Sequence, residues 1–401
     1  MRLSFIVTSY NILPYIDTCL DSVAAVARPG DRVIVVDDGS DDGTAERVEA
    51  RLAAGLGEGV QVQPVLLGTN TIGGVGIGGN IGLSEALADP ECDGIFFVDG
   101  DDWLEPAGFA AARAAFERGE DEILLANYGE YDDQGRTYRR PADAARWAAL
   151  PRLAPGIEAA RDLALSMIAV PWRKFYRADF LRRQGLRFPE GRFFFEDNPF
   201  HWAVCLAAGR IGFHDSVLCQ HRINRPGQTM ASTGAELMAF FDHYETIIAL
   251  VPGQDAGRAG AALDWLLNNM SWHVDRLAPQ AFWAYAGRAA DVLAAVPDSH
   301  WGAAARRFAA TQIGGIAGAL RRGDVTGVVG VWTQQAQAKA LESDLTRLRN
   351  DVLSRLDAQD RTQTPIKALI ERVDRRLHSE AEIARFAALS ALPLPDAPPL
   401  P

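Results

Sequence analysis

Short apolar runs alternate with helical patterns over about the first 105 residues of the chain. Four of these runs predict buried strands, and they read LSFIV, RVIVV, VQVQPVLL and GIFFV. Between the first two runs, apolar residues recur every three or four positions at Leu13, Ile16, Leu20 and Val23, which predicts a helix that Asn11 could cap. Strands that alternate with helices are typical of βαβ units, so we expect a Rossmann-like, mostly parallel sheet.

The pattern changes at about residue 236. From there the chain is rich in alanine and leucine at helical spacing, and no strand pattern of comparable strength follows. We therefore expect an α/β domain over residues 1–235 and a helical domain over 236–330. We also expect a long helix or coiled coil over 331–390 and a disordered, proline-rich tail over 391–401.

The long helix carries a stripe of apolar residues whose spacings alternate between three and four. The stripe consists of Ala338, Leu341, Leu345, Leu348 and Val352, and after Pro365 it resumes at Ile366, Leu369, Ile370, Val373 and Leu377. This spacing is typical of a coiled-coil seam. Two or three heptads are few, so two interpretations stay open: packing on its own chain, and a homo-oligomer through the C-terminal helices.

Composition narrows the class of protein. The chain has 401 residues and a formal net charge of −12, which argues against a nucleic-acid partner because phosphate backbones are bound by basic surfaces. The four cysteines show no metal-ligand spacing and are expected to be reduced, structural thiols. No run approaches the roughly 20 apolar residues of a membrane span. We expect a cytoplasmic protein whose membrane contact, if present, is peripheral, at the inner face.

Polar residues follow three of the expected strands, at the edge where open parallel sheets bind ligands. They lie at 8–11, 37–40 and 99–102, and the last group holds three carboxylates within four positions. Crowded carboxylates raise each other's pKa or gather a cation, and oxygen ligands suit Mg²⁺ or Mn²⁺. Such a metal keeps positions open for substrate phosphates, which points to a diphosphate ligand. The alternative is an inert acidic turn, since Asp and Gly are common turn residues.

Five segments together resemble family 2 glycosyltransferases, which have the GT-A fold. In chain order the segments are FIVTSYN, VIVVDDGSDDGT, GGNIGLSEA, FVDGDD and FEDNPF, and the resemblance covers residues 3 to about 230. It implies transfer of a hexosyl-type sugar, with inversion, from a nucleotide diphosphate sugar donor to a hydroxyl of a glycan or lipid-linked acceptor. Surface polysaccharide synthesis is the family-level expectation.

The resemblance also assigns roles to individual residues. Contacts with the nucleotide sugar are expected from Thr8, Tyr10, Asn11, Asp38, Gly39, Asn80, Asp99, Asp101, Arg222 and Arg225. Metal ligands are expected at Asp101, Asp102 and His221, although an ordinary strand-end histidine is an alternative for His221. Asp197 matches the catalytic base, with Glu196 beside it. Asp197 could also cap the helix that follows, and the two roles are compatible.

One position departs from the family pattern. The family often has an arginine directly before the asparagine of GGNIG, where this chain has Gly79. Phosphate contacts would then fall to backbone N–H groups of the glycine-rich loop, or to the basic residues at 221–225. The aromatic residues Trp172 and Phe175 are expected in the core rather than stacked on a sugar.

Two other functions stay open at this point. A nucleotidyltransferase that makes an activated sugar would also need a nucleotide pocket and an acidic metal site, but the segment TSYNILPYI lacks the glycine-rich, basic signature expected near its first strand. A non-catalytic nucleotide-binding scaffold would not need the set of Asp101, Asp102 and Asp197.

Overall fold

The computed structural model describes residues 1–359 except 72, 151–153, 192–193, 229–231 and 254, and beyond 359 only residues 372, 375, 376 and 379. The chain divides into two compact units, the first over residues 1–231 with 249–251 and the second over the remainder. The apolar stripe expected from Ile366 to Leu377 and the tail expected over 391–401 lie outside the described residues.

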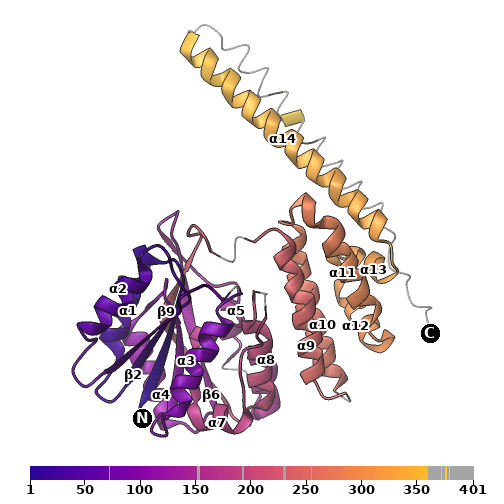
Figure 1. The fold of residues 1–401 in the computed structure, drawn as a ribbon. Coiled ribbons are helices and arrows are strands. Elements are labelled where there is room, and N and C mark those ends of the chain that lie inside the picture. Colours follow the sequence, from indigo (N-terminus) through magenta and orange to yellow (C-terminus); the bar gives the residue numbers. More distant parts are fainter. Residues whose placement is uncertain are drawn as a thin grey trace. The chain divides into compact units, whose positions relative to one another are not determined.

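The first unit is built on one sheet. Its strands are β1 (Leu3–Ser9), β2 (Arg32–Asp37), β3 (Gln61–Leu66), β4 (Gly94–Asp99), β5 (Trp103–Leu104), β6 (Ile123–Asp132), β7 (Thr137–Arg139), β8 (Lys174–Arg177) and β9 (Ile211–Ile223). Within the described residues the order is β3-β2-β1-β4-β8-β6-β9-β5, with β7 paired to β6. Figure 1 shows this sheet with helices packed beside it. The four strands expected from the sequence are β1 to β4, and they are parallel. β8 runs antiparallel between β4 and β6. The expected mostly parallel GT-A-type sheet is therefore confirmed.

Helices pack on both faces of this sheet. They are α1 (Leu13–Val26), α2 (Thr44–Ala53), α3 (Gly76–Ala88), α4 (Pro106–Arg118), α5 (Ala144–Trp147), α6 (Ile157–Leu165), α7 (Ala178–Gln184) and α8 (Asp197–Ala207). Alternate residues of β1 face opposite sides. Phe5 and Val7 join a core with α1, α2 and α4, whereas Ile6 lies directly against Gly82 of α3, where a Cβ would not fit.

The prediction that Asn11 caps α1 is wrong. The N-cap residue is Ile12, whose side chain makes no capping hydrogen bond, and the carboxylate of Asp42 accepts the backbone N–H of Leu13 at 3.0 Å. Asn11 instead adopts a left-handed φ of 49°. Its Oδ1 accepts a hydrogen bond from the backbone N–H of Asp41 at 2.9 Å. Asn11 therefore ties the turn after β1 to the loop after β2, a contact that local helix signals do not reveal.

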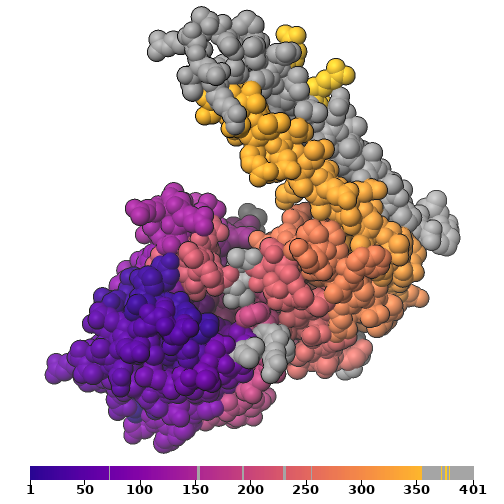
Figure 2. All heavy atoms as spheres, turned by 45° about the horizontal axis from the view of Figure 1, so that its top comes forward, coloured from indigo at the N-terminus to yellow at the C-terminus, as the bar shows by residue number. Residues whose placement is uncertain are grey.

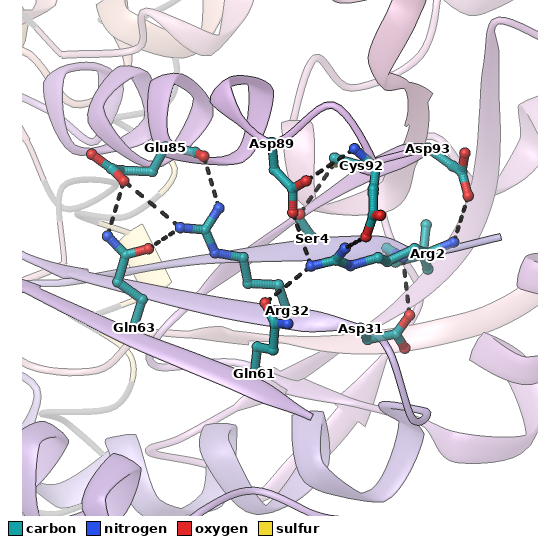
Figure 3. A network of polar contacts seen from close by, with 12 residues as sticks. Arg2, Ser4, Asp31, Arg32, Gln61, Gln63, Glu85, Asp89, Cys92 and Asp93 are labelled. Carbon is teal, nitrogen blue, oxygen red and sulfur yellow. Dashed lines mark hydrogen bonds and ion pairs between the residues drawn. The ribbon is translucent and has the colours of Figure 1, made fainter. Parts of the chain in front are cut away.

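A polar network joins the strands at their amino ends, opposite the edge expected to bind ligands (Figure 3). The backbone N–H of Arg2 donates to Asp93 at 2.7 Å, and that of Leu3 donates to Asp31 at 2.9 Å. Asp31 also forms an ion pair of 2.6 Å with Arg113 of α4, and both side chains are 1% exposed. Because a buried charge without a partner is costly, the Asp31–Arg113 pair ties α4 and the start of β2 to β1.

The second unit is helical. Its α-helices are α9 (Ala239–Leu250), α10 (Ala256–Val274), α11 (Phe282–Ala294), α12 (Asp298–Phe308), α13 (Gln312–Arg321) and α14 (Val325–Gln359). The start of α14 packs against α11 and α13, and the helix then continues beyond the others of this unit (Figure 2). On that extension Leu341, Leu345 and Leu348 are exposed. Among the described helices, none combines the length and apolar character needed to cross a bilayer.

Candidate active site

The carboxyl ends of β1 and β4 lie near the end of β9, a strand that follows them by more than 100 residues in the chain. Asp99, the last residue of β4, pairs with Thr8 of β1. The two-residue strand β5 then pairs with β9. This pairing brings His221 beside Asp102, whose carboxylate lies 2.9 Å from Nδ1 of the histidine. The other oxygen of Asp102 accepts the backbone N–H of Arg222 at 2.7 Å.

The side chains of Asp99, Asp102 and His221 form the candidate metal site. Each offers one ligand atom, and these atoms lie within 4.8 Å of one another. Two carboxylates and an imidazole fit a divalent cation such as Mn²⁺, which accepts oxygen and nitrogen ligands. The sequence grouped Asp101, rather than Asp99, with Asp102 and His221. In the structure the carboxylate of Asp101 forms an ion pair with Nε of Arg225.

The charges in this cluster perturb one another. Burial, and then the charges of Asp102 and Asp101, raise the pKa of Asp99 well above its usual range. Burial also raises the pKa of Asp102, although His221 opposes the rise. Burial lowers the pKa of His221, but Asp102 and the neighbouring carboxylates outweigh it and raise the pKa to about 9. Crowded carboxylates of this kind favour a nearby cation, and a bound divalent cation would displace their protons and that of His221.

Asp197, the expected base, lies close enough to Asp99 for its charge to raise the pKa of Asp99. Asp197 is the first residue of α8. Burial raises its pKa to about 7, and the charge of Lys174 opposes that rise. Asp197 is not the N-cap of α8; that position belongs to Glu196, which makes no capping hydrogen bond. A carboxylate with a pKa near neutrality suits a general base.

Glu196 is buried and points at the glycine-rich loop. Its carboxylate accepts the backbone N–H of Gly76, the first residue of α3. A Cβ on Gly76 would lie 2.6 Å from Cγ of Glu196. Burial raises the pKa of Glu196 to about 7. A protein carboxylate therefore already binds this one N–H group of the glycine-rich loop.

The position of Gly79 explains its departure from the family pattern. A Cβ there would lie 3.1 Å from the ring of Phe188, so any larger residue would require that ring to shift by a few tenths of an ångström. The neighbouring Asn80 is buried, and its amide donates to the carbonyl of Phe188 at 2.9 Å and to Glu190 at 2.8 Å. Its Oδ1 accepts the N–H of Phe188 at 3.0 Å. Asn80, expected to contact the donor, thus holds the segment at 188–190 in place.

Three of the residues expected to contact the nucleotide follow β1 and β2: Tyr10, Asp38 and Gly39. The carboxylate of Asp38 accepts the backbone N–H of Thr71 at 3.0 Å, the hydroxyl of Thr71 at 2.9 Å and the amide of Asn70 at 3.0 Å. Gly39 has a φ of 73°, and a Cβ would lie 2.6 Å from the nitrogen of Asn70. Tyr10, just after β1, is 47% exposed. Tyr10 is therefore accessible to a ligand, whereas the carboxylate of Asp38 binds the loop after β3.

Two aromatic residues behave as the sequence suggested. Trp172 is 4% exposed and Phe175 is fully buried, so both belong to the core. Trp172 also stacks on His221, with ring centroids 4.8 Å apart and an interplanar angle of 23°. It therefore fixes the orientation of a candidate metal ligand.

The structure adds Lys174 and Asp133, which sequence reasoning missed. Lys174 lies in β8 and is 1% exposed. Burial lowers its pKa to about 7. Asp133 pairs with Arg222 at 2.5 Å. A lysine within the aromatic-rich segment at 172–176 was a signal for Lys174, and nothing in the sequence connected Asp133 to the site.

All four cysteines are free and buried. This agrees with the expectation of reduced, structural thiols.

Comparison with known proteins shows what the first unit is similar to. Residues 4–185 match the sequence model of Glycosyl transferase family 2. An uncharacterized glycosyltransferase, EpsJ of Bacillus subtilis (strain 168), is 29% identical over 224 residues, which are 55% of this chain and 61% of EpsJ. Poly(ribitol-phosphate) beta-N-acetylglucosaminyltransferase TarS of Staphylococcus aureus (strain MW2) is 25% identical over 261 residues, 65% of this chain and 42% of TarS. The matches span less than two thirds of either relative.

The fold is shared as well. The crystal structure of S. aureus TarS 1–349 in complex with UDP-GlcNAc superposes with a TM-score of 0.63 at 22% identity, covering 83% of this chain and 92% of that one. The matched family segment contains β1 to β4 and the acidic cluster at their carboxyl ends. Residues 4–185 of this chain therefore resemble glycosyltransferase family 2 in sequence, and the first unit has the GT-A fold.

Proposed function

We propose that this protein is a metal-dependent, inverting glycosyltransferase that transfers a hexosyl-type sugar from a nucleoside diphosphate donor to a hydroxyl of a glycan acceptor. The observation that carries the proposal is the placement of Asp197, a carboxylate with a pKa of about 7, beside the cluster of Asp99, Asp102 and His221. A proton acceptor and a cation-binding group are the two elements that such a displacement requires.

In this proposal, one group of residues acts on the acceptor hydroxyl and another acts on the donor diphosphate. Asp197 would accept the proton of the acceptor hydroxyl, which is a poor nucleophile while protonated. Lys174 keeps the pKa of Asp197 from rising further, so the base is largely ionised at slightly alkaline pH. A divalent cation held by Asp99, Asp102 and His221 would neutralise charge on the leaving diphosphate. A single displacement with no protein nucleophile inverts the anomeric carbon.

For the donor we propose a uridine diphosphate sugar, with UDP-GlcNAc as the first candidate. The supporting observation is that the TarS structure with the shared fold holds UDP-GlcNAc. For the acceptor we propose a polyhydroxylated cell-surface polymer, because TarS acts on poly(ribitol-phosphate) by its name.

The test measures release of free nucleoside diphosphate. Purified protein is incubated with Mn²⁺, a panel of nucleotide sugars and a panel of glycan acceptors. We expect one donor to be consumed by the wild type and consumption to fall at least 100-fold in Asp197→Asn, in line with the loss of a general base. Asp179→Asn is the matched control, since Asp179 is 64% exposed and lies on α7.

Three outcomes would contradict the proposal. Pyrophosphate formed from a nucleoside triphosphate and a sugar phosphate would identify a nucleotidyltransferase. Tight nucleotide binding with no donor ever consumed would identify a binding scaffold. Full activity of Asp197→Asn would remove Asp197 as the base.

A further inference from the structure

Two arginines follow His221, and the structure holds them in different ways. The side chain of Arg222 is 10% exposed and pairs with Asp133 at 2.5 Å. Its Nε donates to the backbone carbonyl of Asp101 at 2.9 Å. The guanidinium also lies over the rings of Tyr15 and Trp103, 4.6 and 5.1 Å from their centroids. Arg222 lies in β9, and these contacts on several sides hold its guanidinium in place.

Arg225 is held by less. Within the described residues its side chain contacts the carboxylate of Asp101 and the backbone carbonyl of the adjacent Pro226, with the ring of Tyr15 5.8 Å away. It lies on the loop after β9, where Asn224 and Gly227 have positive φ values of 61° and 75°. Among the described residues, its one charged partner is therefore a carboxylate of the acidic cluster itself.

This pairing removes Asp101 from the candidate metal site. Asp101 follows Asp99 by two residues and precedes Asp102, yet its carboxylate is not among the atoms that converge there. A guanidinium and a divalent cation repel each other and compete for the same carboxylates. A diphosphate, however, offers the guanidinium a partner with more charge and a matching two-oxygen geometry.

We propose that Arg225 is an exchangeable counter-ion: it neutralises Asp101 in the donor-free enzyme and transfers to the diphosphate when the donor binds. After the exchange, Arg225 no longer neutralises Asp101, and the negative charge of Asp101 stabilises the bound cation. Nucleotide and cation therefore bind cooperatively. This inference rests on the proposed function, since it takes the ligand to be a nucleoside diphosphate. Arg225 acts here as a positioning residue that makes cation binding depend on the donor.

The test measures Mn²⁺ binding by electron paramagnetic resonance, with and without UDP, on the full chain. For the wild type we expect weak binding of Mn²⁺ alone and at least tenfold tighter binding with UDP. For Arg225→Gln we expect Mn²⁺ alone to bind at least threefold more tightly than to the wild type, and UDP to improve that binding less than threefold. Arg139→Gln is the control, because Arg139 is 54% exposed and pairs with Asp132 outside the acidic cluster.

Each result has a distinct meaning. Unchanged or weaker binding of Mn²⁺ alone to Arg225→Gln, with a wild-type circular dichroism spectrum, overturns the exchange while leaving the proposed function intact. A wild type that binds neither Mn²⁺ nor UDP overturns both. The same gain in Arg139→Gln would show a general effect of removing positive charge, and it would also overturn the exchange.

Discussion

Replacing Asp197 by asparagine should make the protein more stable at alkaline pH while abolishing its activity. The pKa of this carboxyl rises from 3.8 to about 7 in the folded chain, mainly through burial. The unfolded chain therefore loses the proton first as pH rises. Below pH 3.8 this carboxyl is protonated in both states, and its contribution to the stability of the folded state is fully present. The contribution is lost progressively as the pH rises to about 7. Asparagine does not titrate, so the variant keeps what the wild type loses.

The size of the effect follows from the same values. Each pH unit between the two pKa values costs the wild type about 1.4 kcal/mol, so the interval from pH 5 to pH 7 corresponds to roughly 3 kcal/mol. Because Asp197 keeps partial exposure, solvent screening reduces this to about 2 kcal/mol. The hydrogen bond that Oδ1 accepts from Asn198 at 2.9 Å can persist in the variant. Lys174 interacts with Asp197, so without the Asp197 charge its pKa falls further in the variant, and this change acts in the same direction.

The assay is urea unfolding at pH 5 and pH 8, followed by tryptophan fluorescence, for wild type and Asp197→Asn. The difference in unfolding free energy between the two proteins should shift by about 2 kcal/mol in favour of the variant at pH 8. In parallel, kcat of the wild type should rise about tenfold per pH unit below pH 7 and level off above it. A stability difference that does not change with pH, or a wild type that gains stability at pH 8, would refute the reasoning.

Two substitutions test the fold around the site. Arg113→Met leaves Asp31 buried without its partner, so the unfolding free energy should fall by about 3–5 kcal/mol, measured as a lower urea midpoint; a change below about 1 kcal/mol would contradict the pairing. Gly76→Ala should lower the thermal midpoint, although alanine normally favours a helix by about 1 kcal/mol, because the new Cβ meets Glu196. Gly68→Ala, with nothing within 4 Å of the added Cβ, is its control and should leave the midpoint unchanged.

The sequence determined the elements and their order. Apolar runs and helical spacings depend on residues close together in the chain, and they correctly gave β1 to β4 with helices between them. They also placed acidic residues at the strand ends, and parallel strands bring those ends to one edge. The family motifs added Asp197 and the basic segment at 221–225. None of this required knowledge of which distant residues touch.

Only the tertiary structure decided how those residues are grouped. Asp101 pairs with Arg225, which lies 124 positions away, and Asp99 therefore takes its place beside Asp102 and His221. Glu196 contacts Gly76 across 120 positions. These pairings depend on how β9 and α8 return to the sheet, and on the cost of leaving a buried charge without a partner. A local sequence pattern can place a carboxylate at the carboxyl edge of the sheet, but the charged group that it contacts depends on how the whole chain packs.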